Sequence, residues 1–188
     1  SGSVQVVDAR ETAEYLAGHL PGAVSIPVSA LRDEAYGTTV PIDEAAALFD
    51  AAGVHPDRPV LVYADQLADA AYVAWVLVSL GAERVRLLDG GIAAWQAAGG
   101  EIVASSVGEG RSQSGTGGGA GPWSARVASR WPSGRVLDLI DLYSVIDSPD
   151  IVLVDTRAAG ERDEAIAGGA NPEADHHVAW TELVTEDG

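Results

Sequence analysis

The first hundred residues alternate short apolar runs with longer segments of helical pattern. The apolar runs are rich in β-branched residues, as buried strands are, and they lie at 4–7, 24–26, 59–63 and 85–88. The helical patterns lie between and after them, at 9–17, 42–52, 69–80 and 92–98. Strands and helices that alternate at this spacing predict an α/β domain whose parallel sheet is covered by helices.

The alternating pattern stops between Ser105 and Gly121, where seven glycines stand among mostly small and polar residues. Such a composition behaves as flexible coil and therefore predicts a linker. A glycine-rich phosphate-binding loop is the alternative, but that motif needs a helix directly after it, and Pro122 and Trp123 follow here. In a chain of 188 residues, we expect a first domain over 1–104, a linker over 105–121 and a second domain over 122–188.

The sequence after the linker repeats the start of the chain. The segment VQVVDAR at 4–10 aligns without gaps with IVLVDTR at 151–157, and SIPVSAL at 25–31 aligns with HVAWTEL at 177–183. A further helix is predicted over 137–146, before the apolar run at 151–154 that is predicted as a strand. Nothing after it matches residues 59–95, so residues 122–188 are predicted to be the N-terminal part of a second, truncated copy.

Charge and cysteine content exclude several classes of function. The chain carries 28 acidic and 11 basic residues, a net charge of -17, and this surface repels nucleic acid and anionic membranes. Cysteine is absent, which removes disulfides, thiolate metal sites and cysteine nucleophiles. No apolar window reaches the ~18 residues of a membrane helix and no export leader is visible, so a cytoplasmic location is the default expectation.

Four motifs, in this order, resemble the rhodanese superfamily, and specifically its tandem-domain thiosulfate and mercaptopyruvate sulfurtransferases. The motifs are VVDAR at 6–10, GHLPGA at 18–23, PVLVY at 59–63 with its following helix, and LDGGIAAW at 88–95. The VDTR at 154–157 begins the second copy in the same way. The resemblance implies a rhodanese-like α/β domain with a central, mainly parallel sheet flanked by helices, followed by an incomplete second copy.

The resemblance also implies a reaction in which a cysteine takes sulfur from a donor, becomes a persulfide and passes the sulfur on, without a cofactor. In the family this cysteine opens the loop after the Val-Tyr strand, and a glycine and an arginine are frequent farther along. The corresponding loop in this chain consists of Ala64, Asp65, Gln66, Leu67, Ala68 and Asp69. Ala64 stands at the nucleophile position, Leu67 at the glycine position and Asp69 at the arginine position.

This loop predicts a chain that does not catalyse. The methyl group of Ala64 cannot attack sulfur, and Asp65 and Asp69 would repel an anionic sulfur donor. Two interpretations remain open: a non-catalytic segment of a sulfurtransferase, or a pseudoenzyme that binds a protein partner through the altered loop. A cysteine-dependent phosphatase or arsenate reductase on the same fold fails on the same missing thiol.

The expected partners follow from these two interpretations. A half-built second sheet leaves an open edge, which we expect the remainder of its own domain or another protein chain to cover. A small anionic sulfur donor is expected only in a complete, active protein.

Two repeated ion pairs and one histidine are the other candidate residues. Asp8 with Arg10, and Asp155 with Arg157, could bind a ligand, but an ion pair that ties the strand end to a neighbouring loop is favoured. His19 could act as a catalytic base, yet without a nucleophile a hydrogen-bonded structural histidine is favoured.

Two further features of the sequence concern metal binding and the tryptophans after the linker. Asp175, His176 and His177, with Glu173 nearby, have metal-ligand chemistry, but adjacent residues on an extended segment point in opposite directions, so no metal site is predicted. Trp123 and Trp131 are expected to dock the far end of the linker onto a domain.

Overall fold

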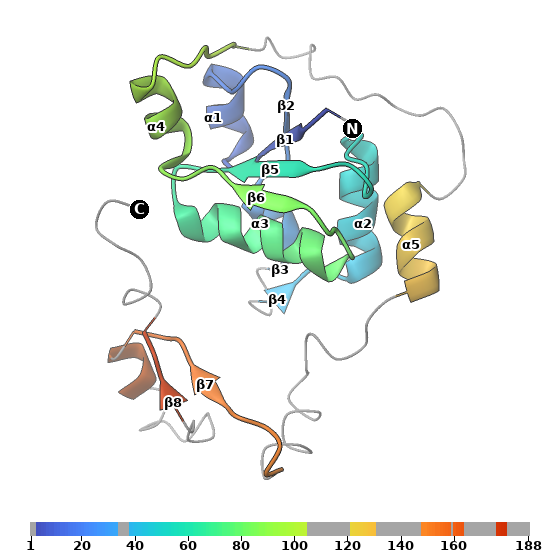
Figure 1. Cartoon of the computed structure of the whole chain (residues 1–188), viewed down its shortest axis with the longest axis vertical. Helices are drawn as coiled ribbons and strands as arrows, with labels where there is room; N and C mark the ends of the chain where they lie inside the picture. Colours follow the sequence, from blue (N-terminus) through green and yellow to red (C-terminus); the bar gives the residue numbers. More distant parts are fainter. Residues whose placement is uncertain are drawn as a thin grey trace. The chain divides into compact units, whose positions relative to one another are not determined.

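The computed structural model divides the chain into two compact units, Ser1–Pro132 and Ser133–Gly188. It describes residues 3–33, 38–104, 121–130, 148–158, 160–163 and 176–179. Each unit is described by itself below, with the labels of Figure 1. The helix predicted over 137–146 and most of the predicted linker lie outside the described residues.

The first unit is built on a parallel sheet of four strands in the order β2-β1-β5-β6. In chain order these strands are β1 (Gln5–Asp8), β2 (Ala23–Ser25), β5 (Val60–Tyr63) and β6 (Val85–Leu87). In the centre of the sheet Val7 pairs with Val24 on one side and with Val62 on the other. The fold class predicted from the sequence, a mainly parallel sheet flanked by helices, is confirmed.

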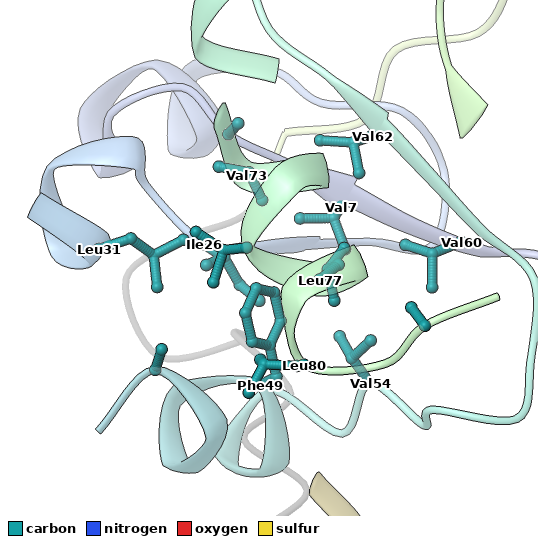
Figure 2. Packing of buried hydrophobic residues seen from close by; sticks show 14 of the residues in the cluster. Val7, Ile26, Leu31, Phe49, Val54, Val60, Val62, Val73, Leu77 and Leu80 are labelled. Atoms are coloured by element: carbon teal, nitrogen blue, oxygen red, sulfur yellow. The ribbon is translucent and has the colours of Figure 1, made fainter. Parts of the chain in front are cut away.

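Helices cover both faces of this sheet. Successive residues of each strand point to opposite faces, so both faces carry side chains on which helices pack. The helices are α1 (Thr12–Ala17), α2 (Ile42–Ala51), α3 (Leu67–Ser79) and α4 (Gly91–Ala97). Val7 and Val62 point into a core shared with α2 and α3, which Figure 2 shows around Phe49, Val73 and Leu77. A second, smaller core lies on the other face, between the sheet, α1 and α4.

Three local features differ from the sequence-based expectation. A short 3-10 helix, η1 (Val28–Leu31), leads into a small antiparallel ribbon of β3 (Arg32–Asp33) and β4 (Thr38–Thr39) that no pattern predicted. Helix α1 begins at Thr12 and not at residue 9, because Glu11 is extended and forms a capping box with Glu14. Helix α3 begins at Leu67, two residues before the predicted start.

Helix α5 (Pro122–Arg130) also belongs to the first unit. Trp123 is fully buried there and packs against Phe49 of α2, as the docking expectation for this tryptophan predicted. The compact units divide after Pro132, so the boundary that the sequence suggested at residue 122 lies before the actual division.

The described part of the second unit contains two short parallel strands, β7 (Val154–Asp155) and β8 (His176–His177). The apolar run predicted as a strand from residue 151 is therefore strand only at its end. Asp155 pairs with His177, just as Asp8 pairs with Ser25 in the first unit. This register is the one that the alignment of the two copies implies.

Candidate functional site

The candidate site lies where the chain crosses from β5 to α3, at the carboxyl edge of the sheet. The chain leaves β1 towards β2 and later returns to β5 on the opposite side, so the sheet order reverses here. In open parallel sheets, ligands bind at the carboxyl edge beside such a reversal. Ala64 follows β5 directly, which places the altered loop, residues 64–69, at this position.

The second half of the altered loop is helix. Ala64 is buried, Asp65 and Gln66 are exposed, and Gln66 is the N-cap of α3. Leu67, at the position of the family's glycine, is already the first residue of the helix. Only Asp65 and Gln66 therefore stand between Ala64 and the first helical turn.

The turn that leads into α4 lies in close contact with the backbone of Ala64. Gly91 has a φ of +56°, and a Cβ atom there would lie 2.0 Å from the carbonyl oxygen of Ala64. Only glycine permits both this left-handed conformation and this close approach. The Asp-Gly-Gly motif, which follows β6, thus packs against the crossover from β5 to α3.

Asp69, at the position of the family's arginine, forms an exposed ion pair. Its Oδ1 lies 3.5 Å from Nη2 of Arg32, and the Arg32 guanidinium lies over the ring of Tyr72, 4.8 Å from its centroid. Tyr72 in turn shares a 2.8 Å hydrogen bond with the hydroxyl of Thr39. Sequence reasoning did not find Arg32 or Tyr72, because nothing in a loop or a helix pattern signals their contact with Asp69.

An open hollow of about 650 Å³ lies beside this ion pair. Its lining residues are Glu11, Val28, Ser29, Arg32, Asp33, Asp69 and Tyr72. Three carboxylates face one guanidinium, so a small anion would meet net negative charge here. The charge at the site therefore opposes binding of an anionic sulfur donor.

Asp8 and Arg10 lie in a buried network behind the loop. Arg10 donates to Asp8 from Nε at 3.0 Å and from Nη2 at 2.6 Å, and it also reaches the carbonyl of Gly18 at 2.7 Å. The Tyr63 hydroxyl donates to Oδ2 of Asp8 and accepts from the backbone N–H of Leu20. Asp8 is completely buried and the Arg10 side chain is 8% exposed, so neither charge is open to solvent.

The network shifts two titrations. Burial, together with the hydrogen bond to Asp8, raises the pKa of Tyr63 well above its usual value. Burial would by itself lower the pKa of Arg10, but its hydrogen bonds and its attraction to Asp8 outweigh this and raise that pKa. Both groups therefore keep their protonated forms at neutral pH.

His19 lies in the turn after α1. It is buried, its Nδ1 lies 2.9 Å from the carbonyl oxygen of Tyr15, and its ring stacks on the Tyr15 ring at 3.9 Å. Its backbone also pairs with Val103. These contacts hold the imidazole inside the smaller core, and no thiol exists in the chain for it to deprotonate.

The second unit repeats the ion pair of the first. Arg157 donates to Asp155 from its backbone N–H and from Nε, both at 3.0 Å, as Arg10 does to Asp8. His177 Nε2 lies 2.8 Å from the carbonyl oxygen of Arg157. The Arg157 side chain is 34% exposed, so this copy is far more open to water than the first.

The Asp155 carboxyl is expected to titrate well below the ordinary aspartate pKa, because hydrogen bonds and charge from Arg157 favour its ionised form. A lowered pKa stabilises the fold above the ordinary value, and this stabilisation is lost only as the pH falls through the folded-state value. Side-chain carboxyl NMR would measure it. Arg157→Gln should return the pKa towards ~3.9, whereas Arg162→Gln should leave it low. An ordinary pKa in the unsubstituted chain would contradict the ion pair.

The described residues contain no group of three or more His, Asp or Glu placed to hold a metal ion. His176 is exposed on β8, while Glu173 and Asp175 lie outside the described residues. Within the same part of the chain, every helix is too short or too polar to cross a membrane.

Proteins of similar sequence share this architecture. The family model described as "Rhodanese-like domain" matches residues 1–98. SseB of Mycobacterium tuberculosis, provisionally named a thiosulfate sulfurtransferase, is 41% identical over 105 residues, covering 50% of this chain and 36% of that protein. The 3-mercaptopyruvate sulfurtransferase of Escherichia coli is 35% identical over 107 residues, covering 50% of this chain and 38% of that protein.

A solved structure shows a similar fold. The crystal structure of SseA from Escherichia coli, described by its rhodanese fold, matches with a TM-score of 0.73 and 25% identity, covering 98% of this chain and 72% of that one. The match to the curated relatives spans less than two fifths of their length. The family model covers the sheet and helices α1 to α4; this chain belongs to the rhodanese-like domain family.

Proposed function

We propose that the chain is a non-catalytic segment of a tandem-domain sulfurtransferase, formed by an inactive first rhodanese-like domain and the opening part of a second. The observation that carries this proposal is Ala64 at the end of β5, in a chain without any cysteine. The repeated pairing of β7 with β8, in the register of β1 with β2, supports the second copy. The match of SseA across 98% of the chain supports it as well.

In this proposal the first domain forms one wall of a substrate cleft and stabilises its partner domain. The sulfur donor, a small anion such as thiosulfate, would be handled by a cysteine of the complete second domain. In the first unit β1 pairs on both sides, with β2 and with β5, whereas in the described part of the second unit β7 pairs with β8 alone. Val152 and Val154 are 63% and 48% exposed there, so we expect a further strand, equivalent to β5, to add beside β7.

A pseudoenzyme that binds a protein partner is the second candidate function. One observation favours it: the altered loop departs from the family pattern at three positions, and not only at the position of the cysteine. Asp69 holds Arg32 against Tyr72, and Asp65 and Gln66 are presented to solvent. An exposed acidic crossover of this kind suits a partner that carries basic side chains.

A thiosulfate:cyanide assay with designed thiols tests the primary proposal. In such a reaction a thiolate attacks the outer sulfur of thiosulfate, a persulfide forms and sulfite leaves; cyanide then takes that sulfur as thiocyanate and regenerates the thiolate. The chain itself should show no transfer. Ala64→Cys alone should stay near background, because Asp65 and Asp69 repel thiosulfate and the loop glycine is missing.

The triple variant Ala64→Cys, Leu67→Gly, Asp69→Arg should exceed Ala64→Cys by at least about tenfold, the scale expected from charge reversal beside an anionic substrate. Gln66→Cys is the matched control for an exposed thiol in the same loop. Transfer by the cysteine-free chain would overturn the proposal. Equal rates for the single and triple variants would show that the loop charges are not what opposes the donor.

A further inference from the structure

Helix α5 is joined to the rest of the first unit by a Gly/Ser-rich stretch, so its position depends on the contacts that it makes. Its anchor is Trp123, the largest fully buried side chain among the described residues. The indole N–H donates to the carbonyl oxygen of Val54 at 2.7 Å, and the indole ring lies 5.9 Å from the ring of Phe49, centroid to centroid. A buried aromatic ring with a satisfied N–H is the typical anchor of a helix docked in a groove.

The carboxylate of Asp50 caps the first turn of α5. Its Oδ1 accepts the backbone N–H of Trp123 at 2.9 Å, and its Oδ2 accepts the backbone N–H and the hydroxyl of Ser124, at 3.0 and 2.7 Å. An anion at a helix N-terminus accepts hydrogen bonds from N–H groups that have no partner within the helix, and it interacts favourably with the positive end of the helix dipole. Gly121 allows this approach, because a Cβ there would lie 2.3 Å from Cγ of Asp50.

Arg126 holds α5 one turn farther along. Its Nη2 lies 2.6 Å from Oδ1 of Asp57, and its Nη1 donates to the carbonyl of Gly81 at 2.9 Å. The acceptor residues come from three separate segments: the end of α2, the loop before β5 and the loop before β6. Together they form a groove that supplies an apolar contact for Trp123, a capping carboxylate and two acceptors for Arg126.

The groove lies away from the altered loop. Val54, Asp57 and Gly81 precede β5 and β6, so they lie towards the amino edge of the parallel sheet, whereas Ala64 follows β5 at the carboxyl edge. Docking of α5 and any chemistry at the altered loop can therefore be altered separately.

We infer that this groove is a docking site for a helix that begins Gly-Pro-Trp-Ser, and that α5 is its ligand, held reversibly within the chain and able to bind without a covalent connection. Covalent connection through a Gly/Ser-rich stretch keeps such a ligand at an effective concentration of roughly millimolar, so even modest intrinsic affinity keeps the groove filled. The inference does not depend on sulfur chemistry.

Cutting the full chain within the glycine-rich stretch tests this inference. A sequence-specific protease site placed between residues 110 and 117 leaves all other residues present as two fragments. The fragments are expected to co-elute in size-exclusion chromatography, because α5 stays in its groove. Trp123→Ala should weaken their association on the order of 100-fold or more, the scale of a buried Trp→Ala change.

Two controls keep the result interpretable. Trp75→Ala removes an exposed tryptophan of α3 that is not part of the groove, and it should leave the cut fragments associated. If Trp123→Ala disturbs folding of the first unit, a synthetic peptide of residues 119–132 offers a second measurement on the unsubstituted cut chain. An excess of this peptide should release the C-terminal fragment, and the same peptide with Trp123→Ala should not.

Separation of the unsubstituted fragments would overturn the inference. Continued association of the fragments despite Trp123→Ala, or in the presence of excess peptide, would overturn it as well, because contacts other than α5 would then hold them. None of these outcomes bears on the thiosulfate assay, so this inference and the proposed function fail independently.

Discussion

Asp8→Ala is expected to lower the free energy of unfolding of the first unit by about 3–5 kcal/mol, the scale of breaking one side of a buried ion pair. The variant leaves the guanidinium of Arg10, 8% exposed, without its counter-ion. It also removes the acceptor of the Tyr63 hydroxyl and of the Arg10 backbone N–H. Urea unfolding, followed by far-UV circular dichroism and tryptophan fluorescence, would measure the loss.

Asp155→Ala is the matched control, because it breaks the same motif in the second unit, where Arg157 is 34% exposed. Its effect on unfolding should be clearly smaller, since water can replace the lost partner. A double variant, Asp8→Ala with Arg10→Leu, should recover part of the stability, because no unpaired charge is left buried. An Asp8→Ala chain with an unchanged urea midpoint would show that the network does not stabilise the fold.

Local pattern predicted most of the sheet and its helices. Each predicted strand of the first unit is present within two residues, because β-branched runs bounded by turns have few other stable arrangements. The start of α3 was placed two residues too late, at residue 69 and not at Leu67. The β3-β4 ribbon was missed because its two-residue strands carry no periodicity.

The boundary between the units shows what local pattern does not contain. Pro122 and Trp123 follow a glycine-rich stretch, and that position suggested the start of a new domain. Asp50 and Val54, about 70 residues earlier, bind this segment to the first unit. Only the tryptophan hinted at such a contact, because an indole of that size is costly to leave in water.

At the candidate site, the sequence predicted which residues occupy the altered loop, and the structure showed which residues they contact. The absent nucleophile at Ala64 followed from alignment with a family motif. The pairing of Asp69 with Arg32 did not, because it joins the first turn of α3 to β3, 37 residues earlier. The role of Gly91 was equally hidden: a glycine in a turn is ordinary, and only the carbonyl oxygen of Ala64, which would lie 2.0 Å from an added Cβ, explains it.

Gly91→Ala is therefore expected to destabilise the first unit by about 3 kcal/mol or more. Two costs combine: a left-handed conformation costs a residue with a Cβ roughly 1–2 kcal/mol, and overpacking costs typically about 1–3 kcal/mol. The second cost is hard to relieve here, because the obstacle is the backbone carbonyl of Ala64 and not a flexible side chain. We expect the amide signals of Ala64 and Asp65 to move in NMR spectra, together with a lower urea midpoint.

Gly99→Ala separates the two costs at the other end of the same helix. Gly99 has a φ of +79° with nothing within 4 Å of an added Cβ, so only the conformational cost of about 1–2 kcal/mol should remain. The excess loss in Gly91→Ala over Gly99→Ala measures how firmly the turn before α4 presses on the crossover. Equal losses in the two variants would mean that the backbone of Ala64 shifts easily, and that its close approach to Gly91 does not fix the loop. A larger loss at Gly91, with shifts confined to residues near Ala64, would establish that α4 holds the loop in its present form.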